Sequence, residues 1–184
     1  YVDRAQSAQK SSAYLKLNPN GLIPVLADGP LVLYETAAIC LHLAGANPKA
    51  GLAPALGTAE RAHAYKWLAW MTNTLQAALI LYFYPERWMN EGNAAGAAEL
   101  KGHAEAKIGA MLDLLDAQFA SHGADWFSGA RYSVLDPYAF VLCRWTRGFA
   151  RPARSLPRIG PYLQRMLARP AVQRALATEK LAPP

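Results

Sequence analysis

The chain has 184 residues, of which 53% are hydrophobic and 17% are charged, and its formal net charge is +6. This length and balance are sufficient for one or two globular domains with a buried core, and they exclude an intrinsically disordered protein. The longest uncharged apolar run, Ala77 to Tyr84, has eight residues. A membrane-spanning helix needs roughly 18, so we expect no membrane association.

The first region of the chain consists of short apolar runs separated by turn residues. Ser11 or Ser12 is placed to cap a short helix that ends near Leu17. The sequence Asn-Pro-Asn-Gly at 18–21 breaks that helix. The region therefore begins with a helical turn and a strong break.

A β-hairpin is predicted next. The runs 22–27 and 31–34 are rich in β-branched and aliphatic residues, and Asp-Gly-Pro separates them. A helix is expected over 35–44, where the sequence is apolar nearly all round, and it should stop at Gly45 and Pro48.

The second region has helical spacing and almost no strand signal. Thr58 is placed to cap a long helix with one apolar stripe, which ends at Pro85. Ser133 and Asp136 have the spacing of a capping box. The five expected helices cover 58–84, about 97–121, 133–149, about 158–168 and 170–178.

These patterns divide the chain into two domains. We expect a small α/β domain over residues 1–46, a proline-containing linker over 47–57 and an all-helical domain over 58–184. The fold class is therefore α/β followed by all-α.

The two cysteines, Cys40 and Cys143, lie far apart in apolar helical patterns and form no Cys-x-x-Cys pair. This arrangement argues against a disulfide scaffold and against a structural metal site. A reducing compartment, most simply the cytoplasm, is expected.

Positive charge is concentrated at the C-terminal end. From Arg144 onward there are eight arginines and one lysine against a single acid, Glu179. A stripe of arginines would suit an anionic partner such as nucleic acid. The interpretation we favour is a solvated basic face with some arginines paired to carboxylates, because prolines interrupt the stripe and no nucleic-acid motif accompanies it. The five arginines of the stripe are Arg144, Arg147, Arg151, Arg154 and Arg158.

Three motifs occur in a specific order. Residues 18–26 read NPNGLIPVL, residues 33–39 read LYETAAI, and Ser133-x-x-Asp136 follows in the helical region. Together they resemble the cytosolic glutathione transferases, bacterial members above all, over about residues 2 to 181. The resemblance implies a thioredoxin-like N-terminal domain, N-terminally incomplete in this sequence, followed by an all-helical C-terminal domain.

The resemblance also implies a glutathione site. Pro24 would follow a cis peptide bond, and the backbone of Ile23 or Val25 would bind the cysteinyl unit of glutathione as an added strand does. From the residues alone, Pro24 is an ordinary edge-strand proline. Glu35 would pair with the ammonium group of the γ-glutamyl unit and Thr36 with its carboxylate.

The residues at the start of the predicted helix allow two interpretations, an anion-binding site and a plain helix start. Free N–H groups at a helix N-terminus suit a carboxylate, although Glu35 and Thr36 also fit a plain helix start. Either Gln9 or Lys10 is a candidate for binding the glycine carboxylate, and an ordinary solvated lysine is an equal interpretation of Lys10.

The resemblance assigns no residue that activates the glutathione thiol. In the family this is a Tyr, Ser or Cys after the first strand, and the chain begins at Tyr1, in what resembles the second strand. Gln76 stands where one bacterial class has a histidine, which argues against that class. A second-substrate pocket would lie against the long helix and the helix of Trp145, with Gln76, Tyr84 and Trp145 as candidate lining residues.

The expected function is that of a glutathione transferase that uses glutathione as co-substrate on a small electrophilic apolar substrate. No metal is expected, nucleic acid is an improbable partner, and the resemblance implies a homodimer. The alternative is a non-catalytic transferase-like binding module whose basic C-terminal face contacts a protein or RNA.

Overall fold

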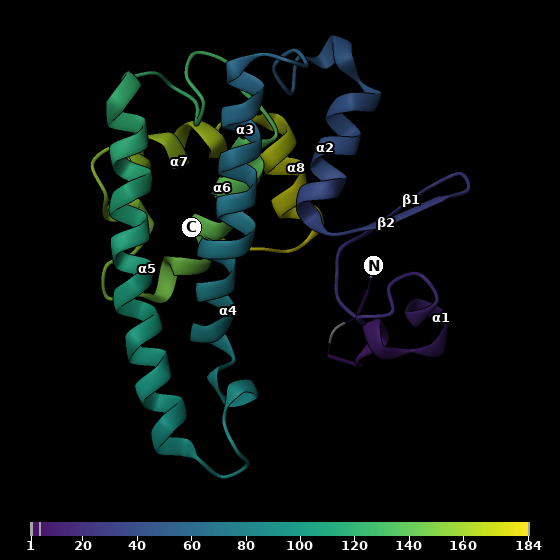
Figure 1. Ribbon diagram of the computed structural model, residues 1–184, viewed down its shortest axis with the longest axis vertical. Coiled ribbons are helices and arrows are strands. Elements are labelled where there is room, and N and C mark those ends of the chain that lie inside the picture. The colour runs from purple at the N-terminus through teal and green to yellow at the C-terminus, as the bar shows by residue number, and fades with distance from the viewer. Residues whose placement is uncertain (1, 4, 184) are drawn as a thin grey trace. The chain divides into compact units, whose positions relative to one another are not determined.

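The computed structural model describes residues 2–3 and 5–183. The chain divides into two compact units, Tyr1–Ala53 and Pro54–Pro184. The first contains a hairpin and short helices, and the second is helical (Figure 1).

The N-terminal unit is built around one two-stranded antiparallel sheet. Ser11 caps the first helix, because its hydroxyl accepts a hydrogen bond from the N–H of Tyr14, as predicted. The two strands are joined by a two-residue turn in which Gly29 has a φ of 56°, a value that favours glycine. The elements in order are η1 (Ala8–Lys10), α1 (Ser12–Leu15), β1 (Val25–Asp28), β2 (Leu31–Tyr34), α2 (Thr36–Ala46) and η2 (Pro48–Ala50).

Strand β1 begins at Val25, three residues later than the apolar run predicts. The carbonyl oxygen of Leu22 accepts hydrogen bonds from the Tyr14 hydroxyl at 2.9 Å and from the Asn18 amide at 2.7 Å. Pro24 has no N–H to donate to a neighbouring strand. The segment before β1 is therefore an anchored loop.

Helix α2 continues through Gly45 and ends at Ala46, so the prediction that Gly45 stops it was wrong. A single glycine only lowers helix propensity. The end comes at Asn47, whose side chain donates a hydrogen bond to the Leu43 carbonyl. Pro48 follows, and a residue before proline avoids the helical conformation.

The C-terminal unit has a helix in each region where one is expected, and Thr58 caps the first of them as predicted. The helix expected over 133–149 is shorter: α6 spans Leu135–Trp145, and Phe149 lies beyond it with an extended backbone. Helix α4 packs along α5, and α6 packs against α3 and α7. The elements in order are α3 (Ala59–Trp70), η3 (Met71–Gln76), α4 (Ala77–Phe83), η4 (Pro85–Trp88), α5 (Ala94–His122), α6 (Leu135–Trp145), η5 (Thr146–Gly148), η6 (Ala153–Ser155), α7 (Ile159–Leu167) and α8 (Pro170–Thr178).

The helix predicted over 58–84 has a wider π-helical segment, η3, in its middle. Within it the Thr72 hydroxyl oxygen lies 3.0 Å from the carbonyl oxygen of Leu68, four residues earlier, and 3.0 Å from the Tyr138 hydroxyl of α6, and its one proton is donated to one of the two. Tyr138 in turn donates a hydrogen bond to the Gln76 side chain. π-helical turns often occur where side chains are aimed at a particular partner.

The start of α6 is the most tightly hydrogen-bonded part of the unit. Asp136 is fully buried. Its carboxylate accepts hydrogen bonds from the backbone N–H groups of Phe127 and Ser133 at 2.9 and 2.7 Å, and from the Ser133 hydroxyl at 3.3 Å. The Tyr162 hydroxyl donates to the Asp136 carbonyl. The predicted capping role of Ser133 and Asp136 is confirmed.

In the described part of the chain, no helix is long and apolar enough to cross a membrane. The same residues contain no group of three or more His, Cys, Asp or Glu side chains placed to hold a metal ion. Both cysteines are free thiols.

Candidate ligand-binding site

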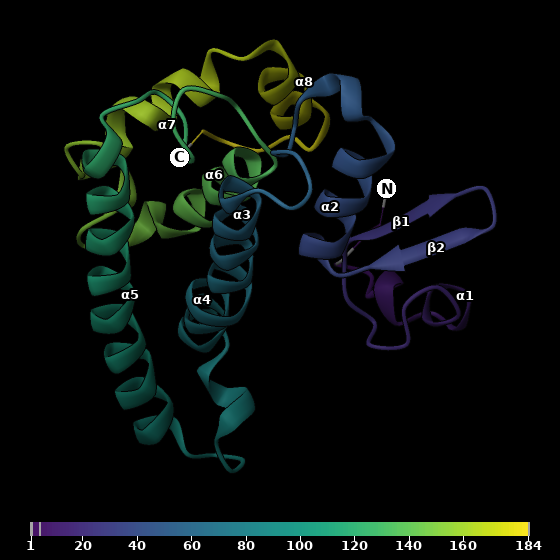
Figure 2. The ribbon, with the colours of Figure 1, turned by 45° about the horizontal axis from the view of Figure 1, so that its top comes forward.

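The register of the hairpin brings two predicted site segments together. Val25 of β1 pairs with Tyr34 of β2, and this is the pair nearest the open end of the hairpin. Ile23 and Pro24 directly precede β1, and Glu35 and Thr36 directly follow β2, the strand that leads into α2 (Figure 2). Directly opposed residues of antiparallel strands are only about 5 Å apart. The two segments therefore form one surface.

The Ile23–Pro24 peptide bond is cis, as the sequence resemblance implies. The Ile23 side chain is 46% exposed. No hydrogen bond joins the Ile23 backbone to another described residue. Because Tyr14 and Asn18 fix the preceding carbonyl, the Ile23 N–H and C=O are held in place and can pair with an extended ligand.

Glu35 has a φ of 75° and a ψ of 113°, a conformation that is uncommon for a residue with a side chain. Its side chain is exposed and makes no capping hydrogen bond to α2. Because the first N–H groups of a helix have no partner within it, the start of α2 presents donors and a partial positive charge. Thr36 is the first residue of α2 and is half-buried.

Lys10 lies over the loop that precedes the cis bond. Its Nζ donates a hydrogen bond to the Asn20 carbonyl at 3.2 Å. A Cβ atom on Gly21 would approach the movable end of the Lys10 side chain to 2.8 Å, and the φ of Gly21, 60°, favours glycine there. Lys10 as a residue is exposed. Gln9 is half-buried and belongs to the same turn, η1.

Sequence reasoning missed two residues that position this surface, Tyr14 and Asn18. Asn18 is 2% exposed, donates to the Leu22 carbonyl and accepts from the Asn20 N–H. The pattern indicated a break at this point and nothing more. A buried side chain that hydrogen-bonds across a loop depends on the folded path of the chain.

The C-terminal unit has a pocket of about 160 Å³. Trp145, a predicted second-substrate residue, contributes to its wall. The rings of Phe83 and Trp145 meet edge to face at 6.2 Å, and those of Tyr82 and Phe149 lie 4.2 Å apart. The residues that line the pocket are Tyr82, Phe83, Trp145, Arg147, Gly148 and Phe149.

The other two predicted second-substrate residues do not line this pocket. Gln76 is half-buried and its side-chain oxygen accepts the hydrogen bond from Tyr138. Tyr84 is half-buried, and the guanidinium group of Arg87 lies 3.9 Å from the centre of its ring.

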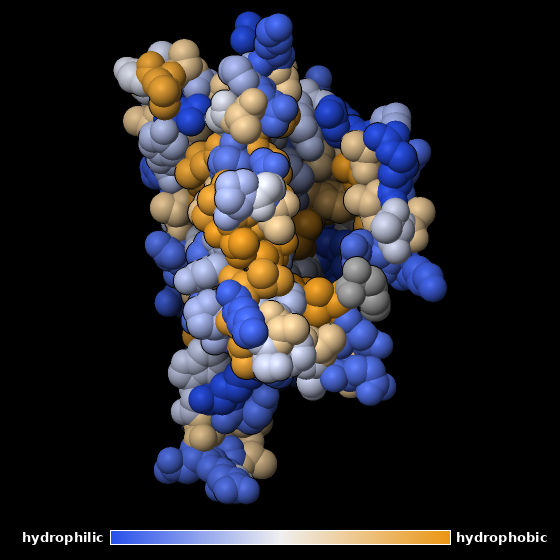
Figure 3. Space-filling model, turned by 90° about the vertical axis from the view of Figure 1, so that its right-hand side faces the viewer, coloured by the Kyte–Doolittle hydropathy of each residue, from blue (hydrophilic) through white to orange (hydrophobic). Residues whose placement is uncertain are grey.

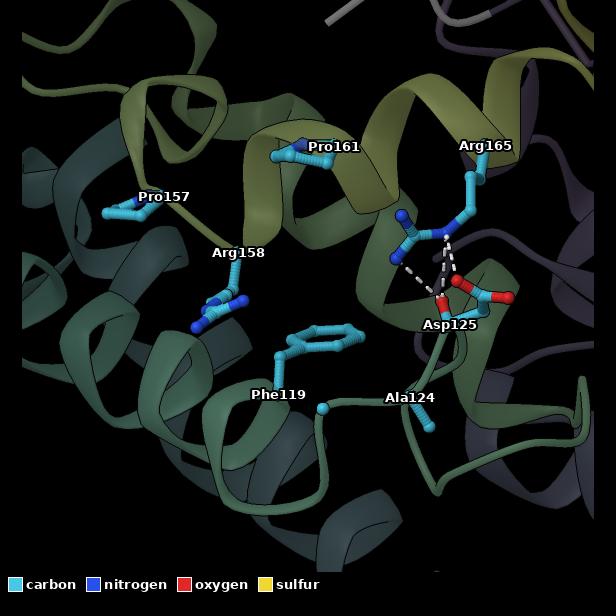
Figure 4. Close-up of a pocket in the computed structure, with 8 residues that line it drawn as sticks. Phe119, Ala124, Asp125, Pro157, Arg158, Pro161 and Arg165 are labelled. Atoms are coloured by element: carbon cyan, nitrogen blue, oxygen red, sulfur yellow. Dashed lines mark hydrogen bonds and ion pairs between the residues drawn. The ribbon is translucent and has the colours of Figure 1, made fainter.

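A second pocket in this unit, of about 110 Å³, lies between the end of α5 and α7 (Figure 4). Arg165 donates to the Asp125 backbone carbonyl, and its Nε lies 3.5 Å from the Asp125 carboxylate. The charge of Arg165 is therefore balanced within the protein.

The predicted arginine stripe is broken in space. Thr146–Gly148 and Ala153–Ser155 are separate short turns, η5 and η6. Arg151 makes two hydrogen bonds to the Asp113 carboxylate, at 3.0 and 2.6 Å. Arg144 is 8% exposed and donates to the Ala182 carbonyl. These contacts agree with the interpretation that some arginines pair within the protein.

The two cysteines lack the environment of a reactive thiol. Burial raises the pKa of the Cys143 thiol to about 12. Burial also raises the pKa of the Cys40 thiol. Because the thiolate is the reactive form, both side chains are poor nucleophiles near neutral pH.

The comparison with protein families matches residues 1–46 to the model of the glutathione S-transferase N-terminal domain. Over 182 residues the chain is 30% identical to glutathione S-transferase GST-4.5 of Xanthomonas campestris pv. campestris. That alignment covers 98% of this chain and 85% of the relative.

Solved structures resemble the chain over nearly its full length. A glutathione transferase homolog from Sulfitobacter, crystallised with bound glutathione, superposes with a TM-score of 0.87 at 26% identity, covering 98% of this chain and 85% of that one. A sphingomonad glutathione S-transferase complexed with glutathione gives a TM-score of 0.79 at 30% identity, with 95% and 83% covered.

Proposed function

Because this chain belongs to the glutathione S-transferase family, we propose that it binds glutathione on its thioredoxin-like N-terminal unit and uses the glutathione thiolate on an electrophilic apolar substrate. The observation that carries the proposal is the hairpin register, which sets the cis Ile23–Pro24 segment beside the N-terminus of α2. That surface combines free strand-like backbone groups with an anion-binding helix end.

Each part of the tripeptide has a matching group on this surface. The cysteinyl unit pairs with the backbone of Ile23, with Pro24 and Val25 shaping the strand. The γ-glutamyl carboxylate binds the N–H and hydroxyl of Thr36 at the start of α2, and its ammonium group pairs with Glu35. Lys10, an exposed residue whose side chain lies over Gly21, pairs with the glycine carboxylate.

The reactive thiol belongs to glutathione. Neither cysteine of the chain competes for that role, because burial raises the pKa of both thiols. In a conjugation, the thiolate sulfur attacks an electrophilic carbon of the second substrate, a C–S bond forms, and the leaving group departs with its electron pair. The protein contributes by holding the thiolate and the electrophile together.

We propose that the second substrate binds in the aromatic pocket of Trp145. Apolar rings suit an apolar electrophile. Tyr84 and Gln76 act at most from outside this pocket, since neither lines it and Gln76 is bonded to Tyr138.

We further propose that the protein acts as a cytoplasmic homodimer. Two free cysteines suit a reducing compartment. Apolar side chains are exposed on the face in Figure 3, and the large apolar residues that are exposed in the chain include Leu56 and Trp88. Light scattering coupled to gel filtration tests the dimer: a mass twice that of the chain supports it, and the mass of one chain contradicts it.

The proposed function is tested by capture on immobilised glutathione. We expect retention, and release by free glutathione and also by γ-glutamylalanylglycine, which lacks the thiol but keeps the backbone, the ammonium group and both carboxylates of the proposed contacts. Failure to bind glutathione in solution by isothermal titration calorimetry would contradict the proposal.

A further inference from the structure

The Trp145 pocket has the size and lining of a site for one aromatic ring. Four of its six lining residues are aromatic. Phe83 is 41% exposed, so the pocket is open at that side chain, and Phe149 is buried behind it. A cavity of about 150 Å³ is known to accommodate benzene, and this pocket measures about 160 Å³. Ring-to-ring contacts would stabilise an aromatic ligand.

Arg147 is the one charged residue among those that line the pocket. Its guanidinium donates a hydrogen bond to the Arg144 carbonyl at 3.3 Å, and its own carbonyl accepts one from Arg154. These bonds hold Arg147 at the end of α6. In the part of the chain that the structure describes, no carboxylate lies within ion-pair distance of the Arg147 guanidinium.

This distinguishes Arg147 from the two arginines of the basic segment that have carboxylate partners. Arg151 is paired with Asp113, and Arg165 with Asp125. Burial and, after it, the positive charge of Arg147 lower the pKa of Arg144. The two guanidinium groups therefore repel each other.

Two other charged side chains lie near the pocket, and they do not neutralise the positive charge of Arg147. Lys101 lies 4.9 Å from the centre of the Tyr82 ring. Glu105 is the acidic group nearby: it accepts a long hydrogen bond, 3.5 Å, from the Ala150 N–H, and its charge adds to the burial that raises the pKa of Tyr82. One lysine and one glutamate thus lie near the Tyr82 ring, while Arg147 itself lines the pocket.

We propose that this pocket selects aromatic substrates that carry an anionic substituent, which Arg147 binds while the rings enclose the apolar part. The inference rests on the proposed function for the reaction, since it names the substrate class of the same enzyme. For a halogenated nitrobenzoate, the glutathione thiolate forms a C–S bond at the ring carbon, the carbon–halogen bond breaks and halide leaves. The carboxylate is unchanged and serves recognition only.

The test compares two ligands of nearly equal shape, 4-chlorobenzoate and neutral 4-chlorobenzamide, by titration calorimetry with the whole protein at pH 7 without glutathione. We expect the carboxylate to bind about fivefold more tightly, as suits a partly exposed ion pair. In Arg147→Met the preference should disappear, and in Arg147→Lys most of it should remain. Arg174→Met, which removes an exposed arginine of α8, is the matched control and should keep the full preference.

Equal affinity for the two ligands in the unmodified protein, or an undiminished preference in Arg147→Met, would overturn the inference. If Arg147→Met does not fold, the affinities of the unmodified protein are measured at rising sodium chloride concentration. Its preference for 4-chlorobenzoate over 4-chlorobenzamide must fall as salt is added, and a preference that does not fall overturns the inference. Capture on immobilised glutathione tests the proposed function independently of this pocket. A protein that prefers the carboxylate through Arg147 but does not bind glutathione keeps this site and loses the proposed function.

The kinetic form of the test uses 4-chloro-3-nitrobenzoate and its amide as substrates. Since Arg147 binds a group that does not react, Arg147→Met should raise KM for the carboxylate about fivefold and leave kcat nearly unchanged. KM for the amide should not change. An equal loss of kcat for both substrates would assign Arg147 a general structural role and overturn the inference.

Discussion

Glu35 adopts a backbone conformation that stores free energy, and its side chain makes no capping hydrogen bond to α2. A strained residue of this kind costs about 1–3 kcal/mol and persists when its position serves another purpose. In this protein the conformation leaves the Glu35 carboxylate exposed beside the start of α2. The proposed contact with the γ-glutamyl ammonium group accounts for it.

Substitution of Glu35 should separate binding from stability. We expect Glu35→Gln to weaken glutathione binding by about 1–3 kcal/mol, because a charged hydrogen bond is lost. Glu35→Gly should weaken binding equally and yet unfold at no lower urea concentration than Glu35→Gln, since glycine relieves the strain. The checks are titration calorimetry and urea unfolding. Glu91→Gln, at an exposed carboxylate in the other unit, is the control for binding. Unchanged affinity in Glu35→Gln would remove this residue from the site.

The cysteines give a second prediction for single residues. Cys143 is 3% exposed and its pKa is raised to about 12, so native protein at pH 8 should leave it unlabelled by iodoacetamide. Denatured protein should be labelled at both cysteines. We also expect Cys143→Ala to retain glutathione binding. Mass spectrometry of peptides reads the labelling, and rapid native modification of Cys143 would show that the core around it opens.

At the scale of elements, the cap of α6 links a loop, a helix start and a neighbouring helix. Asp136→Ala leaves the buried N–H groups of Phe127 and Ser133 without their acceptor. We expect a loss of about 3 kcal/mol in the free energy of unfolding, since each unsatisfied buried group costs about 1–3 kcal/mol. Ser133→Ala keeps both backbone bonds and should cost only about 1 kcal/mol. Urea unfolding measures both, and equal losses would contradict this account of the cap.

The contact of α5 with the segment after α6 should depend on pH. The hydrogen bonds from Arg151 lower the pKa of the Asp113 carboxyl. A lowered folded-state pKa stabilises the protein above the unfolded pKa of about 3.9, and the stabilisation is lost as pH falls through the folded value. Arg151→Met should therefore melt at a lower temperature than the unmodified protein at pH 7, and the gap should narrow as the pH falls below about 3.9. A gap that stays constant from pH 7 to pH 3 would argue against the ion pair.

At the scale of the whole molecule, the two units differ in how much apolar surface they bury. The largest fully buried side chains, such as Tyr162, Phe127 and Leu115, all belong to the C-terminal unit. In the N-terminal unit the buried residues include Ala44 and Asn18 but no large apolar side chain among those described. Backbone amides exchange with solvent faster where little apolar surface is buried.

Hydrogen exchange should reveal this difference. We expect amides of β1, β2 and α2 to exchange much faster than those of α6 and α7. Saturating glutathione should slow exchange in residues 22–38 and leave α8 unchanged, because a ligand stabilises the conformation that it binds. Mass spectrometry with peptic peptides resolves these segments. Protection that is uniform along the chain, or that glutathione adds only in the C-terminal unit, would contradict the proposed site.

The sequence by itself determined the order and kind of the elements, because these follow from local chemistry. Three signals act over only a few residues and can therefore be identified from the sequence without knowledge of the fold: the turn residues of the hairpin, the Ser11 and Thr58 caps, and the helical spacing of apolar residues. The motifs also carried the family resemblance, including the cis bond before Pro24. The stop assigned to Gly45 was wrong because a local propensity of about 1 kcal/mol is easily outweighed.

Only the tertiary structure decided how distant residues meet. Asn18 and Tyr14 anchor the Leu22 carbonyl. Tyr138 of α6 donates a hydrogen bond to Gln76 of another helix. Asp113 neutralises Arg151, while Arg147 has no carboxylate partner among the described residues. Each contact joins residues whose closeness depends on the folded path of the chain. Such contacts set the available backbone groups and unbalanced charges, and these are the properties on which ligand binding depends.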